Sequence, residues 1–286
     1  MSLTTTTPVT VPRRRSNRRQ QTLWGIALCA LFLLAIILSP WVMDDAGLGP
    51  VLVQRNQPPA LAHPFGTDWL GRDMLSRSLH GMSLSLRIGL LAAAISALIG
   101  TGLGLAAGTL GGWVDAVITW IIDVFFSLPH LVLLILIAFA MGGGTAGVIV
   151  AVALTHWTSL ARVIRAEVLQ VNSSDYVQLS HRLGRSPLWI ARHHMVPHII
   201  PQLLVGLILL FPHAILHEAA LSFIGIGLSP HIPAIGIILA ESMRHLSTGY
   251  WWLGVMPGLL LLLSVKAFDW LGENVRALLD PKTSQG

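Results

Sequence analysis

The side chains best suited to chemistry stand in one apolar run, FPHAILHEAALSF, which contains His213, His217 and Glu218. His213 and His217 are four residues apart and therefore share one face of a helix. Two imidazoles beside a carboxylate can bind a divalent metal ion, pass protons, or hydrogen-bond to a polar substrate. We predict that His213, His217 and Glu218 line a substrate path, with His213 and His217 as candidate metal ligands. A network in which these groups satisfy only one another is an open alternative.

Enzymatic readings of the same run fit less well. A zinc protease helix needs the order His-Glu-x-x-His, whereas this run has His-x-x-x-His-Glu. The sequence has no Gly-x-x-x-x-Gly-Lys-[Ser/Thr] loop, so the chain does not hydrolyse ATP by that route. His130 and His156, in or near other apolar runs, are interpreted as local hydrogen-bonding groups. We therefore predict no catalytic residue and no cofactor bound by this chain.

The composition shows which elements must position these groups. Hydrophobic residues make up 53% of the chain and charged residues 11%, with a mean hydropathy of +0.70. Soluble domains carry about 25% charged residues, so this chain is predicted to be an integral membrane protein. Its basic residues flank apolar runs, which explains the pI of about 10.3 without a nucleic-acid partner. The single cysteine, Cys29, lies in the first apolar run and predicts neither a disulfide nor a cysteine metal site.

Six apolar runs are each near the roughly 20 residues that cross a bilayer. They are 23–42, 86–110, 117–140, 143–161, 199–224 and 250–269, and they predict an all-α multi-pass protein. The first run is longer than a signal-peptide core and lacks a clear cleavage site, so it is predicted to stay as a span. Gly100 and Gly104 in the second form a small-xxx-small pair, which predicts close helix packing. A flexible gating helix is the alternative use of those glycines.

The charges predict the topology. Thirteen Lys and Arg residues lie in the N-terminal tail, the 162–197 loop and the C-terminal end, against five on the opposite side. Positive charges collect on the cytoplasmic side, so both termini and that loop are predicted to be cytoplasmic. The resulting segments are a tail 1–22, a first span 23–42, an extracytoplasmic segment 43–83, a five-helix core 84–271 and a tail 272–286.

The basic 162–197 loop itself predicts a helix, a break and a second short helix. Ser174 and Asp175 suit a helix N-cap, Gly184 suits a C-cap, and Pro187 suits a first helical position. Such a compact elbow between two spans is typical of a docking surface for a soluble partner. A plain charged loop that only fixes topology is the other interpretation.

The same loop, DYVQLSHRLGRSPLWIARHHMVP, resembles the cytoplasmic loop of permease subunits in binding-protein-dependent ABC importers. The family pattern is Glu-Ala-Ala, three residues, Gly, nine residues and an apolar ending in Pro. Gly184 and Pro197 match it, whereas Gln178 replaces the family Glu. The resemblance implies a coupling helix that sits on an ATP-binding subunit. Its candidate residues are Asp175, Tyr176, Gln178, Gly184 and Pro197.

Two further segments resemble one branch of that family. The segment GTDWLGRD, with Gly66, Asp68, Gly71, Arg72 and Asp73, is similar to a signature of the peptide and nickel importers. Its glycines permit turns, and its charged residues can pair with each other and with Arg77 to fix an extracytoplasmic entry segment. The run from Glu218 to Gly227 resembles dipeptide and oligopeptide permeases, whereas the preceding histidines resemble nickel permeases.

The resemblance implies a type I ABC importer permease fold of six transmembrane helices in a bacterial inner membrane. It implies partners: a sister permease subunit, two ATP-binding subunits that hold ATP and magnesium, and an extracytoplasmic solute-binding protein. The predicted cargo is nickel, a metal chelate or a short peptide. The alternatives are a self-sufficient carrier or channel with His213, His217 and Glu218 as a proton relay, and an intramembrane enzyme.

Overall fold

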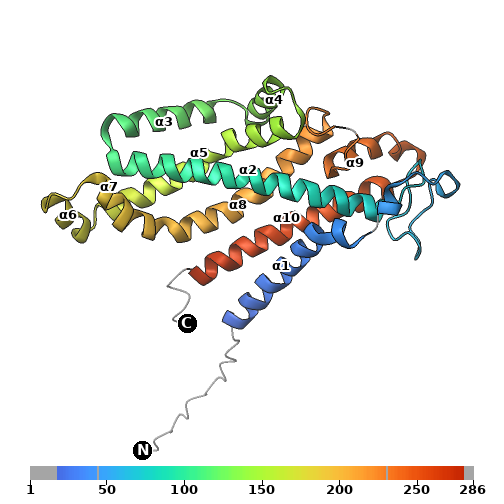
Figure 1. The fold of residues 1–286 in the computed structure, drawn as a ribbon, viewed down its shortest axis with the longest axis horizontal. Helices are drawn as coiled ribbons and strands as arrows, with labels where there is room; N and C mark the ends of the chain where they lie inside the picture. Colours follow the sequence, from blue (N-terminus) through green and yellow to red (C-terminus); the bar gives the residue numbers. More distant parts are fainter. Residues whose placement is uncertain (1–17, 44, 230, 280–286) are drawn as a thin grey trace, which may run out of the picture.

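The computed structural model describes residues 18–43, 45–229 and 231–279, and within them the chain is helical (Figure 1). The α-helices are α1 Arg18–Val42, α2 Met74–Leu110, α3 Gly112–Ser127, α4 His130–Ala140, α5 Gly144–Asn172, α6 Asp175–Arg182, α7 Pro187–Ile190, α8 Val196–Phe223, α9 Ile235–Met243 and α10 Trp252–Leu279. Three short 3₁₀ helices are η1 Asp45–Leu48, η2 Leu52–Gln54 and η4 Leu246–Thr248, and a π-helical segment, η3 Ala191–Met195, continues α7 into α8. Residues 1–17 and 280–286 of the predicted tails lie outside the described residues.

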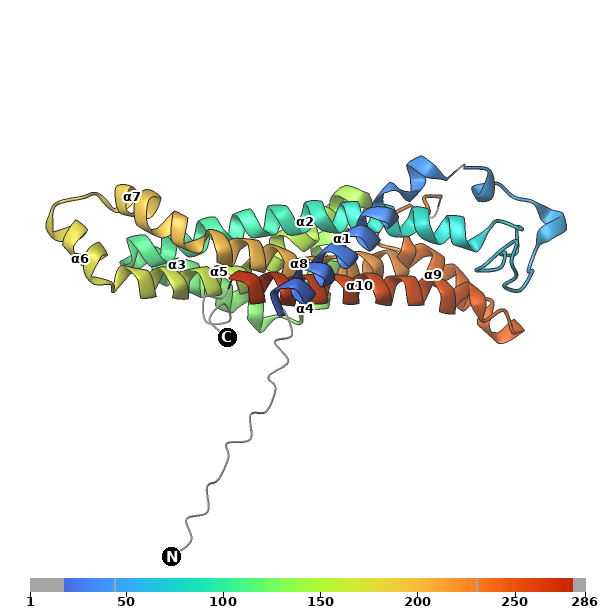
Figure 2. The ribbon, with the colours of Figure 1, turned by 90° about the horizontal axis from the view of Figure 1, so that it is seen from below.

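The long helices run side by side along the longest axis of the molecule (Figures 1 and 2). The most extensive packing joins α2 to α5, and α8 packs against both. Helices α6 and α7 lie at one end, whereas the segment 45–73 and α9 lie at the other. The predicted docking loop and the predicted entry segment are therefore at opposite ends of the bundle.

Five helical runs in the described residues are long and apolar enough to cross a membrane: α1, α2, α5, the run from α7 through α8, and α10. The pair α3 and α4 passes the same test together and gives a sixth span if it is counted as one. The predicted all-α architecture is confirmed.

The predicted span 117–140 is wrong as a single helix. Helix α3 ends at Ser127 and α4 begins at His130, with a bend of 99° between them. Pro129 is the physical reason, because the residue before a proline is pushed out of the helical region. Leu128 is extended there, with φ −95° and ψ 142°. The bend brings the start of α4 against α5.

Helix boundaries also extend beyond the apolar runs. Asp73 caps α2 by accepting a hydrogen bond from the Ser76 amide at 2.8 Å, so residues 74–83 of the predicted extracytoplasmic segment are helical. At the other end of the core, α5 continues to Asn172 and α10 to Leu279. Hydropathy marks the part of a helix that suits lipid, while the backbone hydrogen bonds continue past it.

Close packing of α2 on α5 rests on glycine. A Cβ on Gly100 would lie 2.7 Å from the Trp157 carbonyl oxygen, and one on Gly104 would lie 2.6 Å from that of Ala161. Both distances are too short for a real side chain, so only glycine permits this approach. The predicted packing role of Gly100 and Gly104 is confirmed.

Candidate functional site

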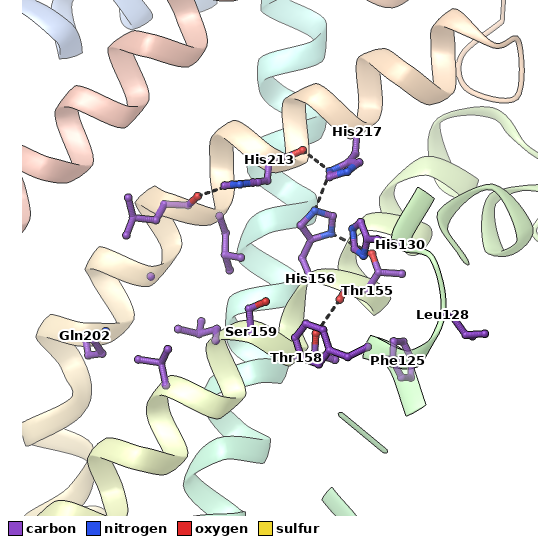
Figure 3. Close-up of a pocket in the computed structure, with 16 residues that line it drawn as sticks. Phe125, Leu128, His130, Thr155, His156, Thr158, Ser159, Gln202, His213 and His217 are labelled. Atoms are coloured by element: carbon purple, nitrogen blue, oxygen red, sulfur yellow. Dashed lines mark hydrogen bonds between the residues drawn. The ribbon is translucent and has the colours of Figure 1, made fainter. Parts of the chain in front are cut away.

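A cavity of about 640 Å³ opens where α5 and α8 meet the bend between α3 and α4 (Figure 3). Its walls are largely apolar, with a few polar groups set among them. The polar side chains that line it are His130, Thr155, His156, Thr158, Ser159, Gln202, His213 and His217. An apolar cavity with a small number of convergent polar groups is typical of a small-molecule site.

Three of the histidines converge from three helices. His130 is the first residue of α4, His156 lies in α5 and His217 in α8. Their ring centroids are 4.8, 4.8 and 4.9 Å apart, and every pair of rings is edge to face. His156 Nε2 and His217 Nδ1 are 3.1 Å apart (Figure 3). The bend at Pro129 delivers His130 to this cluster.

The predicted trio of His213, His217 and Glu218 is divided between two environments. His213 and His217 both line the cavity. Glu218 is fully buried, is not among the cavity residues, and accepts a hydrogen bond from Ser222 at 2.8 Å. Neighbouring residues on a helix point about 100° apart, which separates Glu218 from His217. A path role for Glu218 stays a prediction.

Within the predicted loop 162–197, the structure forms an elbow at the end of the bundle from residues 173–190, which include α6, Gly184 and α7. Ser174 is the N-cap residue of α6, although its side chain makes no capping bond. Gly184 has φ +76°, and the amides of Gly184 and Arg185 donate to the carbonyls of His181 and Ser180. This is a Schellman closure, which needs a left-handed residue. Gly184 therefore ends α6 as predicted.

The second arm of the elbow begins as predicted. Ser186 caps α7 by accepting from the Trp189 amide at 3.3 Å, and Pro187 is the first helical residue. Val177 and Ile190 are buried in one cluster with residues of α5 and α8, so both arms are anchored to the bundle. The outer face carries exposed Tyr176, Leu179, Leu183 and Leu188. Exposed apolar side chains at the tip of a basic elbow fit a protein-docking surface.

Two further predicted coupling residues lie on this elbow and a third lies just beyond it, in α8. Asp175 is exposed in the first turn of α6, where a negative charge is favourable. Gln178 donates from Nε2 to the Asn172 carbonyl at 2.8 Å, at the end of α5. A carboxylate cannot make that donation, so Gln178 suits this local contact. Pro197 is exposed in the first turn of α8.

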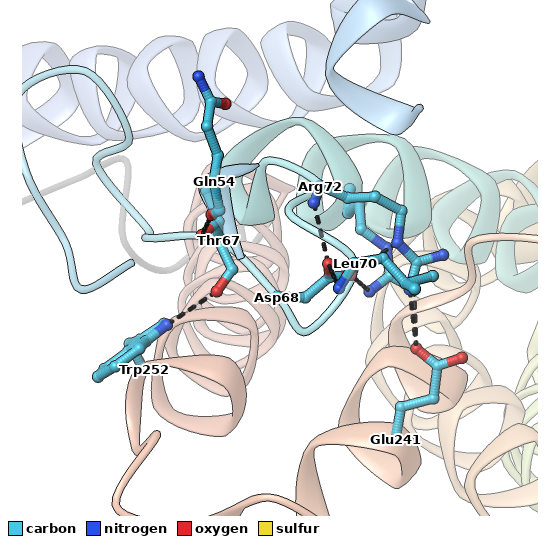
Figure 4. A network of polar contacts seen from close by, with 8 residues as sticks. Gln54, Thr67, Asp68, Leu70, Arg72, Glu241 and Trp252 are labelled. Atoms are coloured by element: carbon cyan, nitrogen blue, oxygen red, sulfur yellow. Dashed lines mark hydrogen bonds and ion pairs between the residues drawn. The ribbon is translucent and has the colours of Figure 1, made fainter. Parts of the chain in front are cut away.

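The predicted entry segment is held by a buried carboxylate (Figure 4). Asp68 accepts from the backbone amides of Leu70 and Arg72, both at 2.9 Å. It also accepts from Arg72 Nε at 2.6 Å and from Arg77 Nη1 at 2.8 Å. Arg77 in turn donates to Glu241 of α9 at 2.8 Å. The charges of the segment therefore pair as predicted and tie it to α9.

The glycines of that segment are required by its turns. Gly66 has φ +72° and Gly71 has φ +76°. A Cβ on Gly71 would lie 1.8 Å from the Val51 carbonyl oxygen, which excludes any side chain. Trp252 Nε1 donates to the Thr67 carbonyl at 3.2 Å and ties the segment to α10 (Figure 4).

Comparison with known families settles the class of protein. Residues 100–283 match the family described as binding-protein-dependent transport system inner membrane component. The chain belongs to this family. It is therefore a multi-pass inner-membrane permease subunit of an ABC importer and carries out no catalysis itself. Family membership implies that ATP is hydrolysed on partner subunits and that a solute-binding protein takes part.

Several relatives are similar over nearly the whole permease. The dipeptide transport system permease protein DppC of Bacillus subtilis is 33% identical, covering 94% of this chain and 84% of that protein. A putative peptide transport system permease protein of Brucella suis is 36% identical, covering 96% and 92%. The probable D,D-dipeptide transport system permease protein DdpC of Escherichia coli is 36% identical, covering 91% and 87%.

A solved structure shares the fold. A chain of the MetNI methionine ABC transporter, described in an inward-facing conformation, superposes with a TM-score of 0.58 at 20% sequence identity. The similarity covers 72% of the permease and 98% of that chain. At this identity the match supports the ABC importer permease fold and nothing about cargo.

Two ion pairs near the elbow were not predicted. Arg165 of α5 donates to both carboxylate oxygens of Asp115, with the Nη2 to Oδ2 distance at 2.6 Å. Arg162 donates to Asp123 at 2.7 Å. Both pairs join α5 to α3 of the permease. The signal in the sequence was Asp123, a charged residue within the predicted run 117–140, whereas Asp115 lies just before that run.

Proposed function

We propose that this permease carries short peptides across the inner membrane. The supporting observation is its similarity to peptide permeases over more than nine-tenths of its length. The cavity between α5 and α8 is the candidate passage, because its mixed apolar and polar wall suits a peptide-sized solute. A sister permease subunit would complete the pathway, and an extracytoplasmic binding protein would deliver the peptide.

In this proposal both chain ends and the elbow face the cytoplasm, as the distribution of Lys and Arg predicts. Two ATP-binding subunits grip the elbow through Tyr176, Gln178 and Gly184 and rock the helices between outward-facing and inward-facing states. Nucleotide must bind one of these states more tightly than the other, because equal affinity shifts no equilibrium. The segment 45–73, at the opposite end, then faces the binding protein.

The test is uptake of a radiolabelled dipeptide by cells that carry the complete transporter. Deletion of this permease should abolish ATP-dependent uptake, and the wild-type gene should restore it. A permease purified alone and placed in vesicles should move no dipeptide. Transport by the isolated chain would instead support the carrier hypothesis.

A second cargo, nickel or a metal chelate, is favoured by one observation, the histidines on the cavity wall. Uptake of radioactive nickel and of a dipeptide would be compared in cells that carry His213→Ala together with His217→Ala. Selective loss of nickel uptake would support metal transport. Unchanged nickel uptake would contradict metal transport through these histidines.

A further inference from the structure

We propose that His130, His156 and His217 together bind one divalent late-transition metal ion on the wall of the cavity. One potential ligand atom from each of them lies within 4.8 Å of the others. This set differs from the predicted pair of His213 and His217. The metal site deepens the proposed function. It rests on that proposal in one respect, that the cavity is the transport pathway.

Hydrogen bonds fix the tautomer and the ring orientation of His156 in the way that a metal ligand requires. Thr155 uses its hydroxyl hydrogen on the Ala151 carbonyl, at 2.9 Å. His156 Nδ1 lies 3.0 Å from both the Thr155 hydroxyl oxygen and the Val152 carbonyl oxygen, so this nitrogen carries the hydrogen. Nε2 then has the lone pair, which faces His217 Nδ1 at 3.1 Å. A backbone carbonyl that orients a histidine in this way is the usual support of a metal ligand.

His217 makes a similar backbone contact, but through the nitrogen that faces His156. Its Nδ1 lies 2.8 Å from the His213 carbonyl oxygen and 3.1 Å from His156 Nε2. Metal–imidazole bonds are about 2.0–2.1 Å long. If one ion bound both nitrogens at their present separation, the two bonds would meet at the ion at roughly a right angle. An ion can replace the hydrogen between the two rings if His217 takes the tautomer with the hydrogen on Nε2. The His217 ring must then turn slightly, because Nδ1 gives up its hydrogen bond to the His213 carbonyl.

His130 supplies the third ligand, and its ring is the one that can move to bring the three nitrogens within bonding distance of one ion. Two bonds of about 2.0–2.1 Å span at most about 4.2 Å, so a separation of up to 4.8 Å requires a small ring movement. His130 is exposed at the start of α4, next to the Pro129 bend, and has room for it. His156, in contrast, is held in place by burial and by its hydrogen bonds.

The chemistry of the wall selects the ion. The residues found to line the cavity in the described part of the chain include no Asp, Glu or Cys. Neutral imidazoles without carboxylates suit zinc, nickel, cobalt or copper and do not suit magnesium or calcium. Three ligands leave coordination positions open toward the cavity. The amine and carboxylate of a peptide are groups that can fill them.

The test titrates Co²⁺ into the full-length chain in lipid nanodiscs, purified through a histidine-free affinity tag. We expect one tight site per chain, with visible absorption bands typical of nitrogen ligands. His130→Ala and His217→Ala should each weaken the affinity by at least about tenfold, the scale seen even for supporting residues of metal sites. Because His130 is exposed, its variant should keep the wild-type helical content and elution volume.

Two further variants make the result decisive. His198→Ala removes an exposed histidine that pairs with Glu167, outside the cavity, and should leave cobalt binding unchanged. His213→Ala should retain the site, whereas the predicted pair of His213 and His217 requires its loss. Cobalt affinity that survives His130→Ala, or that is lost only with His213→Ala, would overturn the three-histidine site. The measurement uses no ATP, peptide or partner, so its failure is separate from a failure of peptide uptake.

Discussion

At the scale of single residues, Asp68 accepts more hydrogen bonds than any other carboxylate of the entry segment. It is fully buried and accepts four hydrogen bonds, two from backbone amides and two from arginines. A buried charge is tolerated only when it is paired and hydrogen-bonded. Asp68 therefore holds the turn after Gly66 and positions Arg77 for its contact with Glu241.

We predict that Asp68→Asn destabilises the permease. The amide keeps the shape but removes the charge that offsets two arginines, and Arg77 is itself buried. Breaking a buried ion pair costs about 3–5 kcal/mol. The measurement is thermal unfolding in nanodiscs, followed by loss of helical circular dichroism.

The matched control is Lys266→Ala. Lys266 lies 3.6 Å from Asp269, and the two side chains are 70% and 40% exposed. Exposed pairs contribute about 0–1 kcal/mol, so this variant should unfold close to the wild-type temperature. Equal shifts in the two variants would show that the Asp68 network carries no special stability.

Residues were predictable from the sequence where their role depends on the local backbone conformation. The turns at Gly66 and Gly71 followed from the turn preference of glycine, whereas Asp73 was predicted as a pairing charge and its capping of α2 was not predicted. Glu241 was not predictable, because it meets Arg77 across 164 positions of sequence. His130 was read as a local group for the same reason. No spacing rule brings three helices together.

At the scale of elements, the close contact of α2 with α5 depends on glycines, which have no side chain. We predict that Gly104→Ala destabilises the permease, because the new Cβ would lie 2.6 Å from the Ala161 carbonyl oxygen. Overpacking of this kind costs about 1–3 kcal/mol. Thermal unfolding in nanodiscs measures it.

Gly102→Ala is the control on the same helix. It has no atom within 4 Å of the position of a new Cβ. Alanine favours a helix over glycine by about 0.5–1 kcal/mol, so this variant should be neutral or more stable. A destabilised Gly102→Ala would mean that α2 meets something other than α5 on that face.

The elbow makes a second prediction at this scale. Gly184 has φ +76° but open space around it, so strain and not collision limits its replacement. A left-handed conformation costs a residue with a Cβ about 1–2 kcal/mol, and a β-branched side chain suffers most. We expect Gly184→Val to distort the end of α6 and reduce co-purification with the ATP-binding subunits.

Gly184→Asn separates the effect of the backbone conformation from the effect of adding a side chain. Asparagine enters the left-handed region readily, so this variant should keep the partners bound and support most of the peptide uptake. If valine and asparagine behave alike, the left-handed turn is not what the partner requires.

The membrane-crossing runs were predictable in position, but five of them are single helices and the sixth is the bent pair of α3 and α4. Apolar runs located the helices, since lipid selects for them. Pro129 carried the signal for the bend between α3 and α4, but its apolar surroundings favoured one span. Helix α5 extends to Asn172, and in this extension Arg165 and Arg162 pair with Asp115 and Asp123 of α3, which hydropathy does not record.

At the scale of the molecule, two helices connect the elbow to the cavity. Helix α5 runs from the His156 region to Asn172, next to α6. The run from α7 through α8 begins in the elbow and carries His213 and His217. Val177 and Ile190 fix both arms of the elbow to these helices. A force on the elbow therefore acts on both walls of the cavity.

Nucleotide should consequently change access to the cavity. We predict that a maleimide labels Ser159→Cys, on the cavity wall, at rates that differ severalfold between ATP-bound and nucleotide-free transporter. The native Cys29 is 3% exposed and should add little background labelling. Leu61→Cys, fully exposed near the opposite end, should label equally in both states. Equal rates at Ser159→Cys, with ATP-binding subunits shown to be bound, would mean that the elbow does not move the cavity walls. The two helices would then be a scaffold, and the motion would have to pass through the sister subunit.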